Sequence, residues 1–265
     1  MILARLGRMA YINTLPVDWG LVTTPLGSLF SWHRGTPTEL NRLLADARLD
    51  VSPVSSVAAA DRAGEWLILD ALCIGCRGEV GSVILHSDVP VEELHGRTIA
   101  VTAASATAAK LLEVLLARHW KIEAELVPQD RFAQARLLIG DAALKTAQSA
   151  ASGHVYDLGL AWKEYSGMAF VFGLWCLRRS FAEEHHDEAW ALYHLLKASY
   201  AMGRAAAHDV AVEAASATGL TETTLESYFR KLVYVMDHEL RAGLDVFLGS
   251  LGYDPAALET FGEQG

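Results

Sequence analysis

The sequence predicts an α/β protein of two lobes that close on a small anion. The first two-thirds of the chain alternates short β-like runs with helical runs, residues 87–90 interrupt this alternation between two similar blocks, and a helical period follows from about residue 187. Alternating elements favour mainly parallel sheets with helices on both faces. Ligands of such folds lie beyond the carboxyl ends of the strands, so we expect the ligand where the lobes meet.

In the first block, Thr36 is the clearest helix start, because it precedes Pro37 and stands three residues before Glu39. This order is typical of a capping box with proline in the first turn. Further helices are expected to begin near residues 13 and 55. Strands are expected at residues 2–7, 50–54 and 83–86.

In the second block, Ser105 is expected to begin a helix that continues to about Ala117. Strands are expected at residues 98–101, 124–127, 137–139, 156–160 and 170–175. The chain then becomes helical, and Trp190, Tyr193 and Leu196 fall on one helical face. We expect lobe 1 to comprise residues 1–87 and 178–265, and lobe 2 to comprise residues 88–177.

The composition excludes several classes of protein. Of the 265 residues, 52% are hydrophobic and 20% are charged, which permits a large core and argues against disorder. The net charge of −10 argues against nucleic acid or an anionic membrane as the main partner, because both require a basic surface. No stretch of about 18 uncharged apolar residues predicts a transmembrane helix.

The first residues and the cysteines both bear on location. The apolar run at the N-terminus is short and interrupted by Arg5 and Arg8, which is not typical of a signal peptide. Three cysteines, an odd and small number, favour a reducing compartment. We therefore expect a cytoplasmic protein.

Polar residues at helix starts carry most of the functional signal. Ser55 and Ser56 stand at one such start, and Ser105 and Thr107 stand at another. The N–H groups of a helix start, with nearby hydroxyls, bind a carboxylate without lysine or arginine. Ordinary capping explains each group taken alone. Their recurrence in both blocks favours an anion site.

Other motifs favour structural roles. Cys73 and Cys76 form a C-x-x-C pair in an apolar β-like run, without the further ligands of a zinc site, and we expect buried thiols. Residues 140–146 lack the glycine that precedes the lysine of a phosphate loop. Asp141 is expected to cap a helix, and residues 185–187 to form a solvated turn. The motifs G-x-S-x-G, H-E-x-x-H and G-x-G-x-x-G do not occur.

The segment Tyr11–Pro16, Y-I-N-T-L-P, resembles the Y-L-N-S/T-L-P signature of chorismate dehydratases, which act in the futalosine route to menaquinone. The similarity continues in the expected order over nearly the whole chain, through residues 50–56, 81–85, 102–107, 138–144, 156–162 and 170–172. The resemblance implies a fold like that of type II periplasmic binding proteins. It also implies a carbon–oxygen lyase that removes water from chorismate to give 3-[(1-carboxyvinyl)oxy]benzoate, with no cofactor and no metal.

A related enzyme of the same pathway, 1,4-dihydroxy-6-naphthoate synthase, offers an alternative. It carries an I-H-E motif with a basic histidine, and this chain has Ile139-Gly140-Asp141 at the matching place. Asn13 followed by Leu15-Pro16 also fits the dehydratase better. A non-catalytic protein that binds a small anion on the same fold is the second alternative.

The resemblance assigns roles to individual residues. Asn13 and Ser82 are expected to act on the substrate. The expected substrate-binding residues are Ser55, Ser56, Ser105, Ala106, Thr107, Gly140 and Asp141. Dehydratases often carry arginine or another polar residue where this chain has Ala106, so no direct carboxylate contact is expected from that side chain. The Asn13 and Ser82 segments contain no histidine or carboxylate as a base, which favours proton transfer to a carboxylate of the substrate. The oligomeric state is not predicted.

Overall fold

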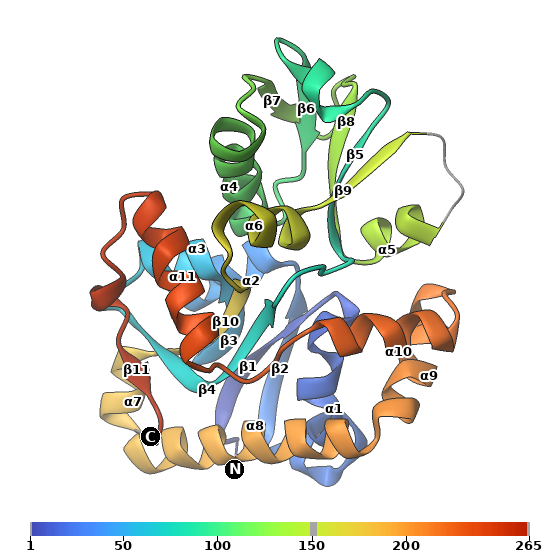
Figure 1. Cartoon of the computed structure of the whole chain (residues 1–265). Helices are drawn as coiled ribbons and strands as arrows, with labels where there is room; N and C mark the ends of the chain where they lie inside the picture. Colours follow the sequence, from blue (N-terminus) through green and yellow to red (C-terminus); the bar gives the residue numbers. More distant parts are fainter. Residues whose placement is uncertain (1, 149–152, 264–265) are drawn as a thin grey trace.

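Two β-sheets, one above the other in Figure 1, organise the computed structural model, which describes residues 2–148 and 153–263. The lower sheet has six strands in the order β11-β4-β10-β3-β1-β2, and the upper sheet has five in the order β7-β6-β8-β5-β9. The lower strands are β1 (Ala4–Met9), β2 (Phe30–Gly35), β3 (Val51–Ser55), β4 (Trp66–Cys76), β10 (Phe170–Arg178) and β11 (Thr260–Phe261). The upper strands are β5 (Val83–Ser87), β6 (Thr98–Val101), β7 (Glu125–Pro128), β8 (Ala135–Ile139) and β9 (His154–Asp157). The α/β prediction is confirmed.

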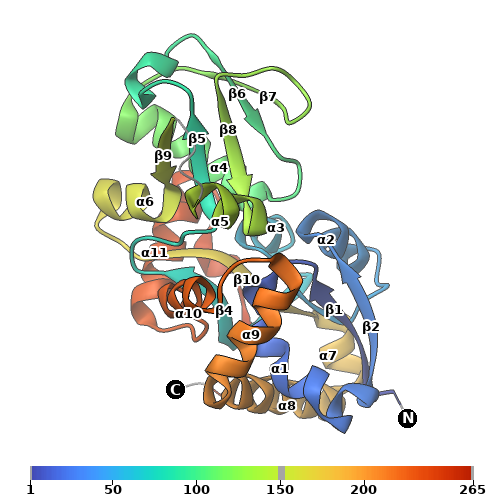
Figure 2. The same ribbon diagram turned by 90° about the vertical axis from the view of Figure 1, so that its right-hand side faces the viewer.

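Helices surround both sheets (Figures 1 and 2). Those of the first block are η1 (Ile12–Thr14), α1 (Leu15–Thr23), η2 (Pro25–Leu29), α2 (Pro37–Ala45) and α3 (Ser56–Asp61). Those of the second block are η3 (Val91–Leu94), α4 (Ala106–Leu115), η4 (Leu116–Trp120), α5 (Gly140–Gln148) and α6 (Leu158–Ser166). The C-terminal part adds α7 (Arg179–Glu184), α8 (His186–Ala205), α9 (Ala207–Thr218), α10 (Glu222–Lys231), α11 (His238–Ser250) and η5 (Pro255–Ala257). No helix in the described ranges is both long and apolar enough to cross a membrane.

Both sheets are mixed, which corrects the expectation of mainly parallel sheets. Strand β1 runs parallel to β2 and β3, but β10 runs antiparallel to both of its neighbours, β3 and β4. In the upper sheet β5 runs antiparallel to β8 and β9. The chain leaves the lower sheet after β4 and enters the upper sheet at β5. Strand β10 brings it back into the lower sheet beside β4, and therefore runs in the opposite direction to β4.

Most predicted helix starts are confirmed. The side-chain oxygens of Thr36, Ser55 and Ser105 accept the N–H of the third residue beyond them at 3.3, 3.2 and 3.3 Å. The second half of the capping box differs from the expectation, because the Glu39 carboxylate lies 3.2 Å from His33 Nε2. Side-chain capping therefore fixes where α2, α3 and α4 begin.

The predicted strand at 156–160 is wrong in its second half. Strand β9 ends at Asp157, and α6 begins at Leu158. The cause is the Asp157 carboxylate, which accepts the N–H of Leu160 at 3.0 Å and caps the helix. The helical C-terminal part also begins earlier than expected, at Arg179.

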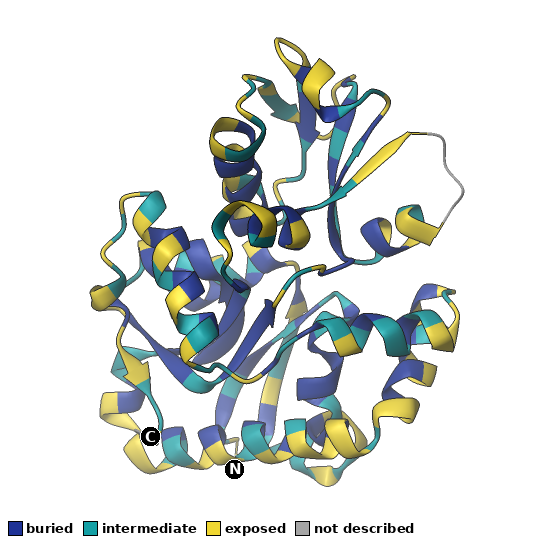
Figure 3. Cartoon of the chain, in the orientation of Figure 1, coloured by how far each residue is buried: buried dark blue, intermediate teal, exposed yellow. Residues whose placement is uncertain are grey.

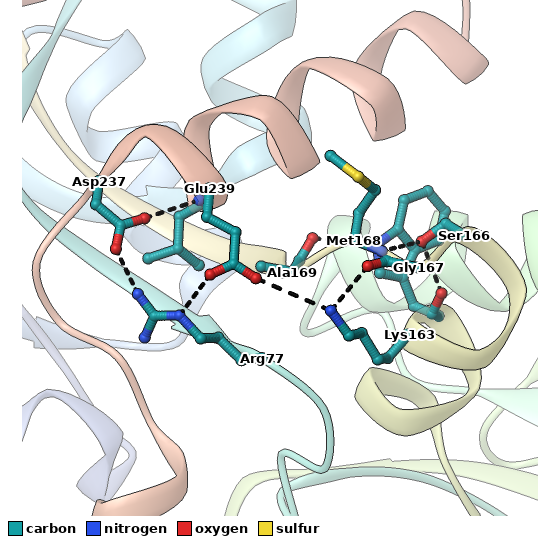
Figure 4. Close-up of polar contacts among 10 residues, drawn as sticks. Arg77, Lys163, Ser166, Gly167, Met168, Ala169, Asp237 and Glu239 are labelled. Carbon is teal, nitrogen blue, oxygen red and sulfur yellow. Dashed lines mark hydrogen bonds and ion pairs between the residues drawn. The ribbon is translucent and has the colours of Figure 1, made fainter.

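The chain passes between the sheets twice, after β4 and before β10, and one polar network holds both passages (Figure 4). Arg77, just after β4, pairs with Asp237 and donates from Nε to Glu239 at 2.9 Å. Lys163 of α6 lies 3.9 Å from Glu239 and donates to the Gly167 carbonyl at 2.7 Å. The start of α11 thus contacts both passages. Both lie ahead of the expected limits at residues 88 and 178, and that division into lobes stays a prediction.

Buried residues gather along the lower sheet (Figure 3), where α11 and α6 contact β10. Strand β3 is buried along its whole length. The rings of Trp162, Phe170 and Phe247 pack edge to face, with centroids 4.7 to 5.7 Å apart. Gly243 permits this contact, because a Cβ there would lie 2.0 Å from the Ala169 carbonyl oxygen.

We expect Gly243→Ala to lower the free energy of unfolding by about 2–3 kcal/mol, because the added methyl group forces α11 away from the passage before β10. Gly249→Ala, in the same helix but with open space at its Cβ, is the matched control. It should raise stability by up to about 1 kcal/mol, because alanine is the better helix former. Urea unfolding measures both. Equal effects of the two substitutions would contradict the packing described for α11.

Candidate functional site

A cavity of about 60 Å³ lies between the two sheets, at the carboxyl ends of β1, β3 and β8. Figure 2 shows α2, α3 and α5 at the level between the two sheets. We call it the interlobe cavity. Its lining residues are Met9, Tyr11, Asn13, Pro37, Val54, Ser55, Ile74, Ser82, Val83, Ser105, Ile139, Gly140, Phe172 and Gly173. A site at strand ends between the lobes is where the fold predicts a ligand.

The structure brings five of the nine predicted site residues to this cavity. Asn13, Ser55, Ser82, Ser105 and Gly140 line it. The other four, Ser56, Ala106, Thr107 and Asp141, lie within two positions of a lining residue in the chain but not on the lining itself. The predicted segments therefore converge, although not every side chain in them faces the cavity.

Helix starts from both lobes converge on the interlobe cavity. Ser55 caps α3, Ser105 caps α4, and Gly140 is the first residue of α5. Asn13 lies in the short turn that leads into α1. Each start presents the positive end of a helix dipole. The field in the cavity therefore favours an anion even though the protein carries a net charge of −10.

The side-chain amide of Asn13 has an atom without a hydrogen-bond partner among the described residues. Its Oδ1 is buried and finds no partner among the described residues. Its backbone carbonyl accepts the hydroxyl of Tyr234 at 3.0 Å, which holds the residue in place. Amide oxygen and nitrogen are assigned from the bonding network. In either orientation Asn13 brings polar capacity to the cavity wall.

Ser82 is held so that its hydroxyl hydrogen is available to a ligand. The hydroxyl of Tyr228 donates to Ser82 Oγ at 3.1 Å, and the Ser82 carbonyl accepts the N–H of Gly140 at 2.8 Å. Burial raises the pKa of Tyr228, so the tyrosine stays a donor. A hydroxyl that accepts one hydrogen bond becomes a stronger donor in the next.

Gly140 occupies a position that favours glycine over residues with a side chain. Its φ is +58°, and a Cβ there would lie 2.9 Å from Cδ1 of the Tyr11 ring. A residue with a side chain is strained in this backbone conformation and also collides with Tyr11. The glycine therefore lets β8 and α5 approach the Tyr11–Pro16 segment closely.

Two predicted ligand hydroxyls are engaged in holding the fold. The hydroxyl of Ser56 donates to the Val171 carbonyl at 2.7 Å. Thr107 Oγ1 accepts the N–H of Val57 at 3.1 Å, which links α4 of the upper lobe to α3 of the lower lobe. Both hydroxyls therefore stabilise the elements around the cavity and do not face it. Ala106 is exposed and offers only a methyl group.

Asp141 links the lobes rather than facing the cavity. Its carboxylate accepts the N–H of Ile12, and burial is the main cause of its raised pKa. Its Oδ1 has no hydrogen-bond partner in the described part of the chain. The charge of Asp141 also adds to the burial that raises the pKa of Tyr11. Its expected contact with substrate stays a prediction.

Tyr11 is the one ionisable side chain among the lining residues that the structure describes. Over residues 2–148 and 153–263, no group of three or more His, Cys, Asp or Glu side chains is placed to hold a metal ion. The C-x-x-C cysteines are buried and free as predicted, and burial raises the pKa of each to about 12. Hydroxyls, an amide and backbone N–H groups are thus what the cavity offers to a ligand.

A family model described as menaquinone biosynthesis matches residues 4–252. The chain belongs to this family. It is 27% identical to the chorismate dehydratase of Thermus thermophilus over 268 residues, which covers 93% of this chain and 94% of that protein.

The solved structures that resemble the chain confirm the predicted fold. A protein of Archaeoglobus fulgidus superposes with a TM-score of 0.74 at 19% identity, over 94% of this chain and 97% of that one. The periplasmic aliphatic sulphonate binding protein of Escherichia coli superposes with a TM-score of 0.66 at 14% identity, over 98% and 94%. This chain thus shares the fold of periplasmic binding proteins.

In this family member, the sequence did not predict the residues that hold the lining residues Ser82 and Asn13 in place. Tyr228 and Tyr234 come from the C-terminal part, about 150 and 220 positions after Ser82 and Asn13, which they contact. Tyr228 lies in α10 and Tyr234 lies three residues beyond its end, and no sequence motif marks either residue. The role of Asp18 was also missed. It is buried below the Tyr11–Pro16 segment, accepts the hydroxyl of Thr14 at 3.0 Å and lies 3.4 Å from Arg8.

We expect Asp18 to make stability depend on pH. Burial raises its pKa to about 6, against the opposing effects of Arg8 and Thr14. Between the ordinary value of 3.8 and about 6 the folded state retains a proton that the unfolded state loses, so stability falls as pH rises through this window. Each tenfold change in proton affinity corresponds to about 1.4 kcal/mol, which gives a total of about 3 kcal/mol.

Asp18→Asn provides the comparison, since it keeps an acceptor for Thr14 without the charge. Relative to this variant, wild-type protein should lose about 2 kcal/mol of unfolding free energy between pH 4 and pH 7. Urea unfolding across this range measures the difference. Parallel stability curves for the two proteins would contradict a buried, proton-retaining Asp18.

Proposed function

We propose that this protein is a chorismate dehydratase that removes water from chorismate to give 3-[(1-carboxyvinyl)oxy]benzoate, the first step of the futalosine route to menaquinone. The observation that carries the proposal is the interlobe cavity, where helix starts and hydroxyls favour an anion and Tyr11 is the one ionisable lining group of the described chain. The similarity to a chorismate dehydratase over nearly the whole chain supports it. We also propose a cytoplasmic location, supported by three unpaired thiols.

The ligand carboxylates are the groups that fit the helix starts. Ser105 caps α4, a helix of ten residues, and lines the cavity from the upper lobe. Ser55 lines it from the lower lobe at the start of α3. Chorismate carries one carboxylate on its ring and a second on the enolpyruvyl ether two ring carbons away, so each lobe can hold one of them. This arrangement fixes the ring between Asn13 and Ser82.

The reaction removes the ring proton beside the ether and the hydroxyl at the next carbon. The C–H electron pair forms the new ring double bond, the C–O bond breaks, and proton and hydroxide leave together as water. The product ring is aromatic, which supplies a large driving force. The protein must orient the substrate and stabilise developing charge, which fixed hydrogen bonds achieve.

Asn13 and Ser82 have the chemistry for these tasks. The polarised Ser82 hydroxyl donates to an oxygen that gains negative charge as the C–O bond breaks. The Asn13 amide oxygen accepts a hydroxyl of the substrate. Among the described lining residues there is no carboxylate or histidine, so the carboxylate of the enolpyruvyl group receives the ring proton.

The geometry at Gly140 favours the dehydratase over the naphthoate synthase alternative. The synthase motif places histidine at the position that Gly140 occupies. A side chain there meets the Tyr11 ring, and the backbone φ of +58° disfavours it. The cavity therefore has no space for that base while Tyr11 holds its place.

Purified full-length protein mixed with chorismate tests the proposal. The diene absorbance should fall only with active protein, and mass spectrometry should find a product lighter than chorismate by one water that retains the enolpyruvyl group. Tight binding without loss of the diene would instead identify an anion-binding protein. A product of unchanged mass would mean that the enolpyruvyl group is rearranged rather than water removed. Inertness towards chorismate would favour the synthase alternative.

We expect Ser82→Ala and Asn13→Ala each to lower kcat by about a hundredfold, as loss of one preorganised transition-state contact does. Tyr228→Phe should have a smaller effect, about tenfold on kcat with little change in KM, because it removes only the polarisation of Ser82. Ser28→Ala is the matched control, since Ser28 is exposed and bonds only to the nearby Pro25 carbonyl. A raised KM with unchanged kcat in Asn13→Ala would leave Asn13 a binding role only.

A further inference from the structure

A second cavity, of about 490 Å³, lies between α8, α9, α10 and the start of α1, at the lower right of Figure 1. We call it the helical cavity. The lining residues that matter here are Tyr200, Arg204, His208, Phe229, Arg230 and Tyr234. Its volume lies in the range of about 300–1,000 Å³ that is typical of small-molecule sites. Neither the interlobe cavity nor the reaction proposed for it uses this space.

The inner part of the helical cavity is aromatic. Tyr234 and Leu232 are buried at its base, and Tyr200 and Phe229 are half-buried on its sides. The rings of Tyr200 and Tyr234 lie 5.4 Å apart between centroids, inclined at 43°. Aromatic rings at such distances and angles offer packing surfaces to a further planar ring.

The opening of the helical cavity is lined by Arg204, His208 and Arg230, with Glu226 as the one lining carboxylate among the described residues. Glu226 lies 3.1 Å from His208 Nδ1 and 3.8 Å from Arg230, and the charges of Glu222 and Asp209 also act on His208. Arg204 forms no ion pair or hydrogen bond with any described residue. One arginine thus stays unpaired and a second shares its partner, in a protein of net charge −10. Arginine binds carboxylates through two parallel N–H donors.

We propose that the helical cavity is a second binding site, for a small aromatic carboxylate. The ring lies against Tyr200, Phe229 and Tyr234, and the carboxylate meets Arg204 and Arg230 at the opening. The proposal goes beyond the dehydratase function and does not depend on it, since no residue of the interlobe cavity takes part.

Tyr234 connects the two cavities. Its ring lines the helical cavity, and its hydroxyl donates to the Asn13 carbonyl at 3.0 Å. The peptide around it is fixed to β4, because the Tyr234 carbonyl accepts the N–H of Cys73 at 2.9 Å. A ligand in the helical cavity therefore contacts the residue that holds one wall of the interlobe cavity.

Benzoate is the probe, titrated into the full chain with ligand-observed NMR as the readout. Benzamide, which lacks the charge, should bind at least about tenfold more weakly, and so should benzoate to the variant with Arg204→Ala and Arg230→Ala. Arg48→Ala, at an exposed arginine before β3, is the matched control and should bind as wild type does. Ala207→Trp should block binding by filling the cavity without changing its charge.

Three results would overturn the proposal. The first is wild-type affinity in the double arginine variant or in Ala207→Trp. The second is binding that is lost in Asn13→Ala and Ser105→Ala but kept in the arginine variants, which would place benzoate in the interlobe cavity. The third is no binding at 10 mM benzoate, about a hundredfold above a typical weak affinity of 100 μM. None of these results bears on the turnover of chorismate.

Discussion

The half-buried carboxylate of Asp157 is the constraint on which the interlobe cavity depends. It accepts three N–H groups, from Val80 at 3.1 Å, Gly81 at 2.6 Å and Leu160 at 3.0 Å. The first two fix the passage from the lower lobe to the upper lobe, and the third begins α6. Burial is the main cause of its raised pKa, and the three N–H groups oppose it. Ser82, which lines the interlobe cavity, is the residue after Gly81. The Asp157 carboxylate therefore fixes the position of Ser82.

Hydrogen bonds between the upper and lower lobes lie beside the cavity. The Thr38 hydroxyl donates to the Ala103 carbonyl at 2.6 Å, Thr107 accepts from Val57, and Asp141 accepts from Ile12. All three contacts are present in this structure, so the upper and lower lobes are held together beside the residues that line the cavity.

The sequence predicted the helix starts that depend only on interactions between residues close together in the chain. Thr36, Ser55 and Ser105 cap helices because a side-chain oxygen reaches an N–H three residues away. The antiparallel course of β10 was not predictable, because it depends on the strands that it joins across the sheet. The contact of Tyr228 with Ser82 spans 146 positions. Ser56 and Thr107 carry the right hydroxyls for a ligand, but only the packing of β10 and α3 shows that these are engaged elsewhere.

A crystal structure with 3-[(1-carboxyvinyl)oxy]benzoate bound tests the central claim most directly, since it shows which side chains meet the product. The account predicts the benzoate ring between Asn13 and Ser82, with one carboxylate at the start of α4 beside Ser105 and the other at the start of α3 beside Ser55. Product bound outside the interlobe cavity, or bound there with its carboxylates turned away from both helix starts, would contradict it.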